Sequence, residues 1–82
     1  MINSNTLDFL EGIIEPLSWD RFGHIKRVGI YTNEGEDIVI ENTNKIPLLK
    51  KLFRKTVKIV GKLHQRSDGE KSILITRIRV VA

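Results

Sequence analysis

The sequence predicts a single small β-barrel of five strands, with one short helix between the third and fourth strands. Three observations favour this all-β class. Apolar and polar residues alternate along five short segments, as in strands with one buried face. Gly-containing turn sequences join two pairs of these segments. A single stretch has the apolar spacing of an amphipathic helix. The 82 residues suffice for one domain, preceded by a short tail, residues 1–6.

The first strand is expected at residues 7–17. One face has Leu10, Gly12 and Ile14, and the other has Phe9, Glu11, Ile13 and Glu15. Gly12 predicts a bulge or a sharp bend, as a small barrel needs where a strand turns a corner. Because Pro16 cannot donate a ladder hydrogen bond, residues 18–23 are expected to form a loop.

The second and third strands are expected at residues 24–32 and 37–42, with a hairpin turn at residues 33–35 between them. Gly35 supplies the positive φ that such turns require. The inward residues are Ile25, Val28 and Ile30, then Ile38 and Ile40. Their uneven spacing predicts an irregularity near Arg27.

The helical stretch begins at Thr43 or Asn44, either of which can serve as the N-cap, with Pro47 in the first turn. Its apolar stripe is Leu48, Leu49, Leu52 and Phe53, and its cations are Lys50, Lys51, Arg54 and Lys55. A helix of about two to three turns does not persist alone in water, so it must plug the barrel.

The fourth and fifth strands are expected at residues 56–64 and 71–81, with a hairpin turn at residues 67–69. In the fourth, Val57, Ile59, Gly61 and Leu63 alternate with Lys58, Val60, Lys62 and His64. The inward residues of the fifth are Ile73, Ile75, Ile78 and Val80. The change of spacing in the fifth strand predicts a bulge near Thr76 and Arg77.

The order β-β-β-α-β-β is that of the five-stranded OB-fold Greek-key barrel, in which the helix caps one end. An SH3-like barrel has no helix at this point. The local pattern includes Gly12-Ile13-Ile14, Trp19-Asp20, Gly23-His24-Ile25, the turn from Thr32 to Glu36, Val57-Lys58-Ile59-Val60-Gly61, and Asp68-Gly69. It resembles small stand-alone bacterial OB-fold proteins and the nucleic-acid-binding OB superfamily of replication protein A and the single-strand-binding proteins. The resemblance spans residues 7–81 and concerns fold more than function.

Charge is segregated along the chain, whose net charge is +4. Residues 1–20 contain four acidic residues and neither lysine nor arginine. Residues 42–67 contain eight basic residues and no acidic one: Lys45, Lys50, Lys51, Arg54, Lys55, Lys58, Lys62 and Arg66. A solvated basic face is the simple explanation, but the absence of interleaved acids favours an anionic partner.

The resemblance implies a binding surface on the second and third strands, residues 24–41, flanked by residues 16–23 and 65–70. Rings that stack on bases and cations that meet phosphates are what single-stranded nucleic acid needs. The candidate residues are Trp19, Arg21, Phe22, Lys26, Arg27, Tyr31, Lys58, Lys62, His64 and Arg66. Tyr31 is the one ring on the expected strands, and Val39 and Glu41 stand where a strong binder carries a ring or cation. Binding is therefore expected to be weak.

Several alternatives stay open. Trp19 could cover the open end of the barrel, and Phe22 could belong to the core. The helix and the fourth strand could offer a separate basic contact through Lys50, Lys51, Arg54, Lys55, Lys58 and Lys62. The competing functions are a protein–protein module, self-associating through a strand edge or acting as a subunit, and a binder of a small molecule or cation.

The sequence contains no motif that is typical of a catalytic site. There is no cysteine, Ser4, Ser18 and Ser67 have no histidine partner in sequence, and no glycine-rich phosphate loop occurs. His24 and His64 lack carboxylates at ligand spacing, so neither a metal nor another cofactor is expected. The first residues contain no signal-peptide pattern, and no apolar run approaches the roughly 18 residues of a membrane span. A non-enzymatic cytoplasmic protein is expected.

Overall fold

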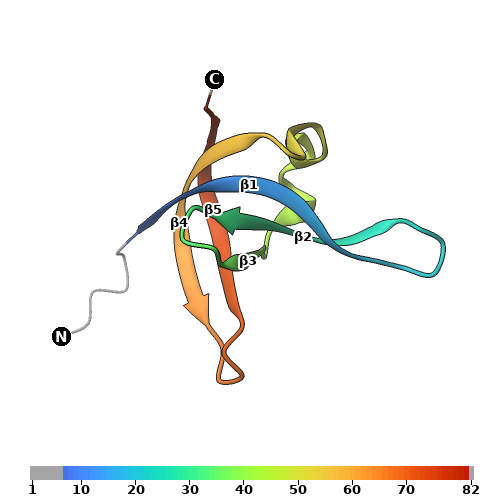
Figure 1. Ribbon diagram of the computed structural model, residues 1–82, viewed down its shortest axis with the longest axis horizontal. Coiled ribbons are helices and arrows are strands. Elements are labelled where there is room, and N and C mark those ends of the chain that lie inside the picture. Colours follow the sequence, from blue (N-terminus) through green and yellow to red (C-terminus); the bar gives the residue numbers. More distant parts are fainter. Residues whose placement is uncertain (1–6, 82) are drawn as a thin grey trace.

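A computed structural model describes residues 7–81 and shows an all-β chain folded as a closed five-stranded barrel (Figure 1). The strands are β1 (Asp8–Trp19), β2 (Ile25–Thr32), β3 (Asp37–Ile40), β4 (Thr56–Gln65) and β5 (Lys71–Val80). Two 3-10 segments, η1 (Thr43–Lys45) and η2 (Pro47–Leu52), connect β3 to β4. The tail expected at residues 1–6 lies outside the described residues.

The strand order around the barrel is β1-β2-β3-β5-β4, and β4 returns to pair with β1. Four of these contacts are antiparallel, and β3 pairs with β5 in parallel. This order, with the helical segment between β3 and β4, is OB-like and confirms the predicted fold class.

The core fills the barrel with branched aliphatic side chains at alternate strand positions. Its buried members are Ile14, Val28, Ile30, Ile38, Ile40, Leu49, Leu52, Val57, Ile59, Ile73 and Ile75. Leu49 and Leu52 come from η2, which packs its apolar side against the strands as predicted. Val80, predicted to face inward, is exposed because it occupies the last position of β5 at the rim of the barrel.

The helical stretch differs from its prediction in type and in capping. It consists of two 3-10 segments separated at Ile46, whose backbone is extended (φ −127°, ψ 78°), and Leu48 is exposed. No side chain caps either segment. The hydroxyl of Thr43 instead donates to the carbonyl oxygen of Ile40, and the amide of Asn42 pairs with the backbone of Ile75. These side chains fasten the connection to the barrel rather than start an α-helix.

β1 bends at Gly12, where it pairs with Thr32 of β2 and with Val57 of β4. A Cβ atom on Gly12 would lie 2.1 Å from the carbonyl oxygen of Tyr31, so only glycine allows this close approach. The register shifts in β1 lie later, between Pro16 and Trp19. The loop predicted from residue 18 was therefore wrong at its start, since a bulge keeps the strand paired beyond Pro16.

The bulge predicted in β5 is confirmed. Val60 pairs with Arg77 while Gly61 pairs with Ile75, which leaves Thr76 as the extra residue. The Thr76 hydroxyl donates to the carbonyl oxygen of Val60 at 2.9 Å.

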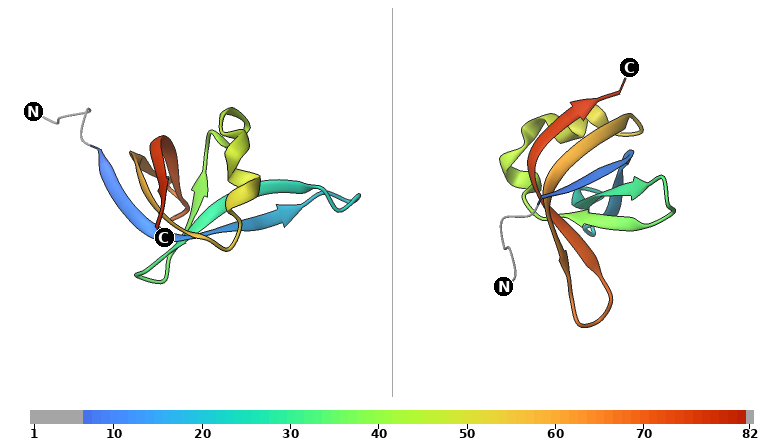
Figure 2. Two further views of the ribbon diagram at one scale, coloured as in Figure 1. Left: turned by 90° about the horizontal axis from the view of Figure 1, so that it is seen from above. Right: turned by 90° about the vertical axis from the view of Figure 1, so that its left-hand side faces the viewer.

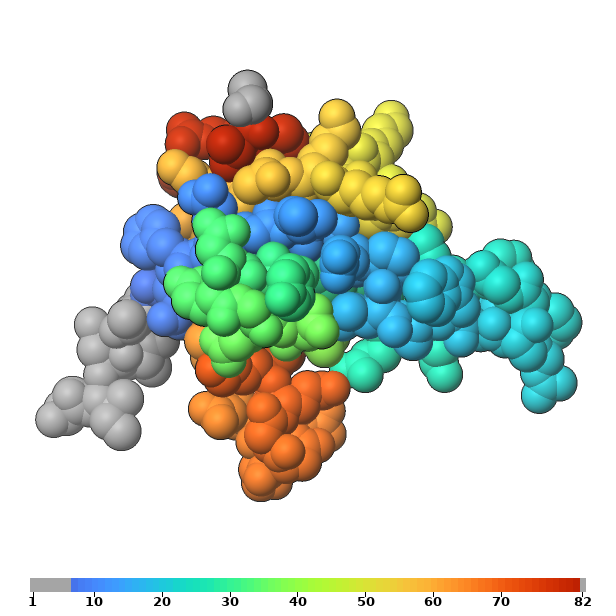
Figure 3. Space-filling model, in the orientation of Figure 1, coloured from blue at the N-terminus to red at the C-terminus, as the bar shows by residue number. Residues whose placement is uncertain are grey.

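The far part of the β1–β2 hairpin, residues 15–26, projects from the barrel and is called the arm (Figures 1 and 2). β4 pairs with β1 only at residues 8–13, and β3 pairs with β2 only at residues 29–31. The arm is therefore a two-stranded ribbon with an unpaired outer edge on each strand. The space-filling view shows it extending away from the body of the molecule (Figure 3).

Gly61→Ala is expected to destabilise the barrel by roughly 1–3 kcal/mol because overpacking forces the strands apart. A Cβ atom there would lie 2.2 Å from the carbonyl oxygen of Leu74, across the β4–β5 ladder. Urea unfolding measures the effect. Lys62→Ala, one residue further along β4, is the control and should change the free energy of unfolding by less than about 0.5 kcal/mol. Equal stabilities of the two variants would contradict this close contact.

Candidate nucleic-acid interface

The structure divides the ten sequence-predicted residues among three places. Trp19, Arg21, Phe22 and Lys26 lie on the arm. Arg27, Tyr31, His64 and Arg66 lie on β2 and on or beside the β4–β5 hairpin end. Lys58 and Lys62 point outward from β4. The expected single surface on β2 and β3 is therefore not assembled from all of them.

The tip of the arm is held by Asp20. Its carboxylate accepts hydrogen bonds from the backbone N–H groups of Phe22 (2.8 Å) and His24 (2.9 Å), and Gly23 adopts a positive φ of 85°. The backbone N–H of His24 is the main cause that lowers the pKa of Asp20 below its ordinary value. The turn is thus fixed by a local carboxylate, in the manner of an Asx turn.

Both aromatic residues of the arm are exposed. Phe22 is 76% exposed and Trp19 is 54% exposed, and neither belongs to the core cluster. The structural alternative for Phe22, a place in the core, was wrong, because this residue lies in the turn at the tip of the arm. Trp19 ends β1 opposite Ile25 and is more than half exposed.

The surface beside β2 and β3 is cross-linked by ion pairs. Arg27 donates to the Glu70 carboxylate at 3.0 Å, and Arg66 reaches the same carboxylate at 3.3 Å. Lys71 pairs with Glu36 at 2.6 Å. These contacts tie the β4–β5 turn and the start of β5 to β2 and the β2–β3 turn, so Arg27 and Arg66 already have an anionic partner.

Glu41 holds a second polar cluster at the end of β3. The Ser72 hydroxyl donates to Glu41 Oε2 at 2.6 Å, and His64 Nδ1 lies 2.6 Å from the same oxygen. The hydrogen bond from Ser72 and then that from His64 lower the pKa of Glu41 below its ordinary value. Tyr31 is the sequence-predicted tyrosine of this surface. It is 44% exposed and lies opposite Asp37 of β3.

On the outer face of β4 and β5, by contrast, cations lie beside an exposed ring. Lys58 stands opposite Arg79, and Val60 stands opposite Arg77 on one side and Phe9 of β1 on the other. Phe9, at 79%, is the most exposed large apolar side chain of the described residues. None of its three cationic neighbours forms an ion pair within residues 7–81.

Sequence reasoning assigned no ligand role to Phe9, Arg77 or Arg79. The alternation of Arg77, Ile78 and Arg79 was a usable signal, because two arginines two residues apart on a strand share a face. What the sequence could not supply is the β1–β4 register that sets Phe9 beside them.

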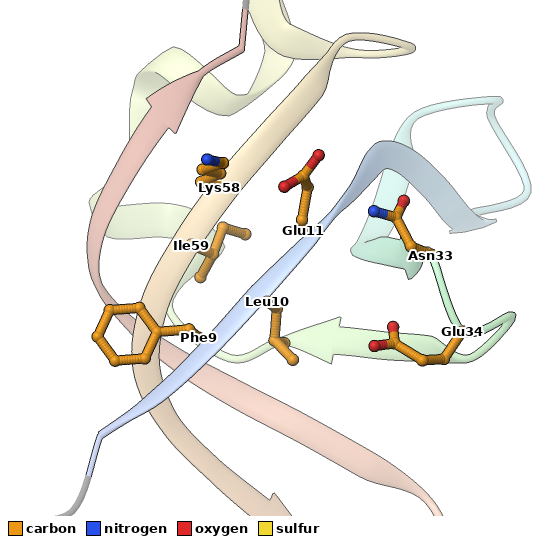
Figure 4. A pocket seen from close by; sticks show the side chains of 7 residues that line it. All are labelled: Phe9, Leu10, Glu11, Asn33, Glu34, Lys58 and Ile59. Atoms are coloured by element: carbon orange, nitrogen blue, oxygen red, sulfur yellow. The ribbon is translucent and has the colours of Figure 1, made fainter.

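A neighbouring hollow adjoins this face and contains acidic residues, one of which, Glu11, stands opposite Lys58 in the β1–β4 ladder (Figure 4). It is lined by Phe9, Leu10, Glu11, Asn33, Glu34, Lys58 and Ile59. The ring of Phe9 extends to the side where β4 and β5 lie, away from Glu11 and Glu34.

Among the described residues, no cluster of three or more histidine and carboxylate side chains could hold a metal ion. No helix in this part of the chain is long and apolar enough to cross a membrane. A scan against protein-family models finds no match, and searches of curated proteins and of solved structures find none either. The fold and the side chains therefore carry the functional argument.

Glu41→Gln is expected to lower the stability of the folded chain at neutral pH by less than about 1 kcal/mol, since the carboxylate is partly exposed. A lowered folded-state pKa means that the carboxylate stabilises the fold above the unfolded pKa, about 4.3. This contribution is lost as the pH falls through the lower folded pKa. Urea unfolding at about pH 7 and pH 3 measures it.

The stability difference between parent and Glu41→Gln should therefore shrink at the acidic pH. Glu34→Gln, in the β2–β3 turn, is the matched control, because Glu34 forms no ion pair within the described chain. A Glu41→Gln difference that grows on acidification would have the wrong sign for this contact.

Proposed function

We propose that this chain is a binding module for single-stranded nucleic acid, with low affinity and no catalytic activity. The observation that carries the proposal is the set of cations without an acidic partner. Of the 14 lysines and arginines, three form ion pairs among the described residues: Arg27, Arg66 and Lys71. In the second half of the chain, the cations that form no ion pair within residues 7–81 are Lys45, Lys50, Lys51, Arg54, Lys55, Lys58, Lys62, Arg77 and Arg79.

Unpaired cations support polyanion binding because their charge is available to phosphates. A phosphate backbone releases counterions when such side chains neutralise it, and this term supplies most of the non-specific affinity. An exposed ring beside the cations adds base stacking, which duplexes hide and single strands offer. Phe9 with its cationic neighbours meets both requirements.

Two further considerations support single-stranded DNA or RNA as the ligand. OB-like barrels frequently bind oligonucleotides, which is an argument from fold analogy. DNA or RNA as the ligand also fits a cytoplasmic location. Low affinity follows from the small number of exposed rings on the barrel itself, Phe9 and Tyr31.

A labelled mixed-sequence single strand of DNA, and its RNA equivalent, should raise fluorescence anisotropy saturably at about 50 mM salt. Each neutralised phosphate contributes about −0.7 to the slope of log K against log salt concentration. Four contacts therefore weaken binding about 50-fold between roughly 50 and 200 mM salt. The same sequence as a duplex is the comparison ligand and should bind less tightly at equal charge. Flat anisotropy with both strands at the lower salt would end the proposal.

The arm supports a second candidate function, self-association of the chain. Both outer edges of this ribbon are unpaired, and a second copy offers matching backbone donors and acceptors. The exposed rings of Trp19 and Phe22 add apolar area that pairing would bury. Isolated two-stranded ribbons are marginally stable, so pairing with another arm would also stabilise this one.

Self-association through the arm predicts a mass in sedimentation velocity that rises with concentration over about 10–500 µM. Trp19→Ala and Phe22→Ala should shift this rise to higher concentration, because each removes apolar area from the contact. Leu48→Ala, which removes an exposed apolar side chain on η2, is the matched control. A mass of one chain throughout this range would eliminate the candidate.

A further inference from the structure

The outer side of β1, β4 and β5 contains a hollow of about 480 Å³. Its lining residues are Phe9, Lys58, Val60, Arg77, Ile78 and Arg79. The volume falls in the range of small-ligand pockets, about 300–1,000 Å³. We call it the Phe9 pocket.

The lining of the Phe9 pocket combines one ring, an apolar floor and cations. Val60 is partly buried and forms the floor, while Phe9 stands up from β1 at its side. Ile78, between the two arginines on β5, stands opposite the buried Ile59 and packs against the core. Lys58, Arg77 and Arg79 are exposed at its margin, and no carboxylate lines it. A planar aromatic ligand with an attached anion fits this chemistry, and a nucleotide is such a ligand.

The spacing of the cations suits a chain of nucleotides rather than a single anion. Arg77 and Arg79 are two residues apart on one strand, about 6.6 Å, and Lys58 lies across the ladder from Arg79. This separation is comparable to the length of one nucleotide in an extended strand. Successive phosphates can therefore meet different cations while a base lies on the ring of Phe9.

The β2–β3 surface is less favourable for binding a phosphate. Arg27 and Arg66 share Glu70, and Lys71 pairs with Glu36. A phosphate arriving there would displace a carboxylate that stays nearby and repels it. On the β4–β5 side no ion pair of residues 7–81 has to be broken.

We propose that single-stranded nucleic acid binds in the Phe9 pocket, with one base stacked on Phe9 and its flanking phosphates on Lys58, Arg77 and Arg79. The inference rests on the proposed function and specifies where it is carried out. It places the ligand on the outer face of β4 and β5 instead of the β2–β3 surface that the sequence predicts.

The test compares matched substitutions on the two surfaces by anisotropy with a labelled single strand. Phe9→Ala is expected to weaken binding about fivefold or more through lost stacking. The double variant Arg77→Ala with Arg79→Ala should reduce the salt slope by about 1.4. Phe22→Ala and Arg27→Ala make the same changes on the sequence-predicted surface, and the inference expects little effect from them.

Two further measurements separate stacking from structural damage. Phe9→Trp keeps a ring at this position and should restore binding. An abasic strand of equal length offers phosphates without bases, so Phe9→Ala and the parent should bind it equally. An equal loss for the abasic strand would show that Phe9 acts through the fold and would overturn its stacking role.

The outcomes distinguish this inference from the proposed function. If the parent binds and only Phe22→Ala and Arg27→Ala weaken binding, the Phe9 pocket is wrong and the proposed function stands. If the parent does not bind either single strand, both fail. Weakening confined to the variants of Phe9, Arg77 and Arg79 supports both.

Discussion

The rest of this structure depends on the double pairing of β1. One strand of 12 residues pairs with β4 along its first half and with β2 along its second, and both ladders overlap at Gly12 and Ile13. The barrel can close because Gly12 has no side chain, so the backbone of Tyr31 can lie where a Cβ atom would otherwise be. Without this bend the sheet would stay open, and the row of branched aliphatic residues would face water on one side.

The position of the bend also determines what lies outside the barrel. Beyond Ile14, which still bridges to Phe53, residues of β1 pair with β2 alone, so the hairpin continues outward as the arm with its two rings. Residues before the overlap lie against β4, and this brings Phe9 of the acidic amino-terminal segment next to the cations of β4 and β5. The close approach at Gly12 thus leaves Trp19 and Phe22 on the arm and Phe9 beside the cations of β4 and β5.

Much of the fold follows from local sequence chemistry. Alternation identified the inward residues of the second, third and fifth strands except Val80, which is exposed, and Gly35 and Gly69, with φ of 86° and 91°, marked the two tight turns. The stretch after β3 was predicted as an α-helix because its apolar spacing suits one. Its actual form is set by tertiary contacts of Asn42 and Thr43 with the barrel, which no local pattern records.

The candidate site was less accessible to sequence reasoning for a related reason. Strand alternation says which residues point outward, but register decides which outward residues become neighbours. Tyr31 was correctly expected at the surface. The acid that pairs with both Arg27 and Arg66, however, is Glu70, which comes from the β4–β5 turn. Phe9 and Arg77 are almost the whole chain apart in sequence and meet only through Val60.

Ion pairing alone does not decide between the two surfaces, because an exposed pair is worth no more than about 1 kcal/mol. A phosphate could displace Glu70 from Arg27 at modest cost. The displaced carboxylate would remain nearby, however, because the backbone of Glu70 does not move away with it, and its repulsion is screened little at short distance. The net field over each surface therefore matters more than the strength of any one pair. It favours the face where Lys58, Arg77 and Arg79 surround a ring and an apolar floor.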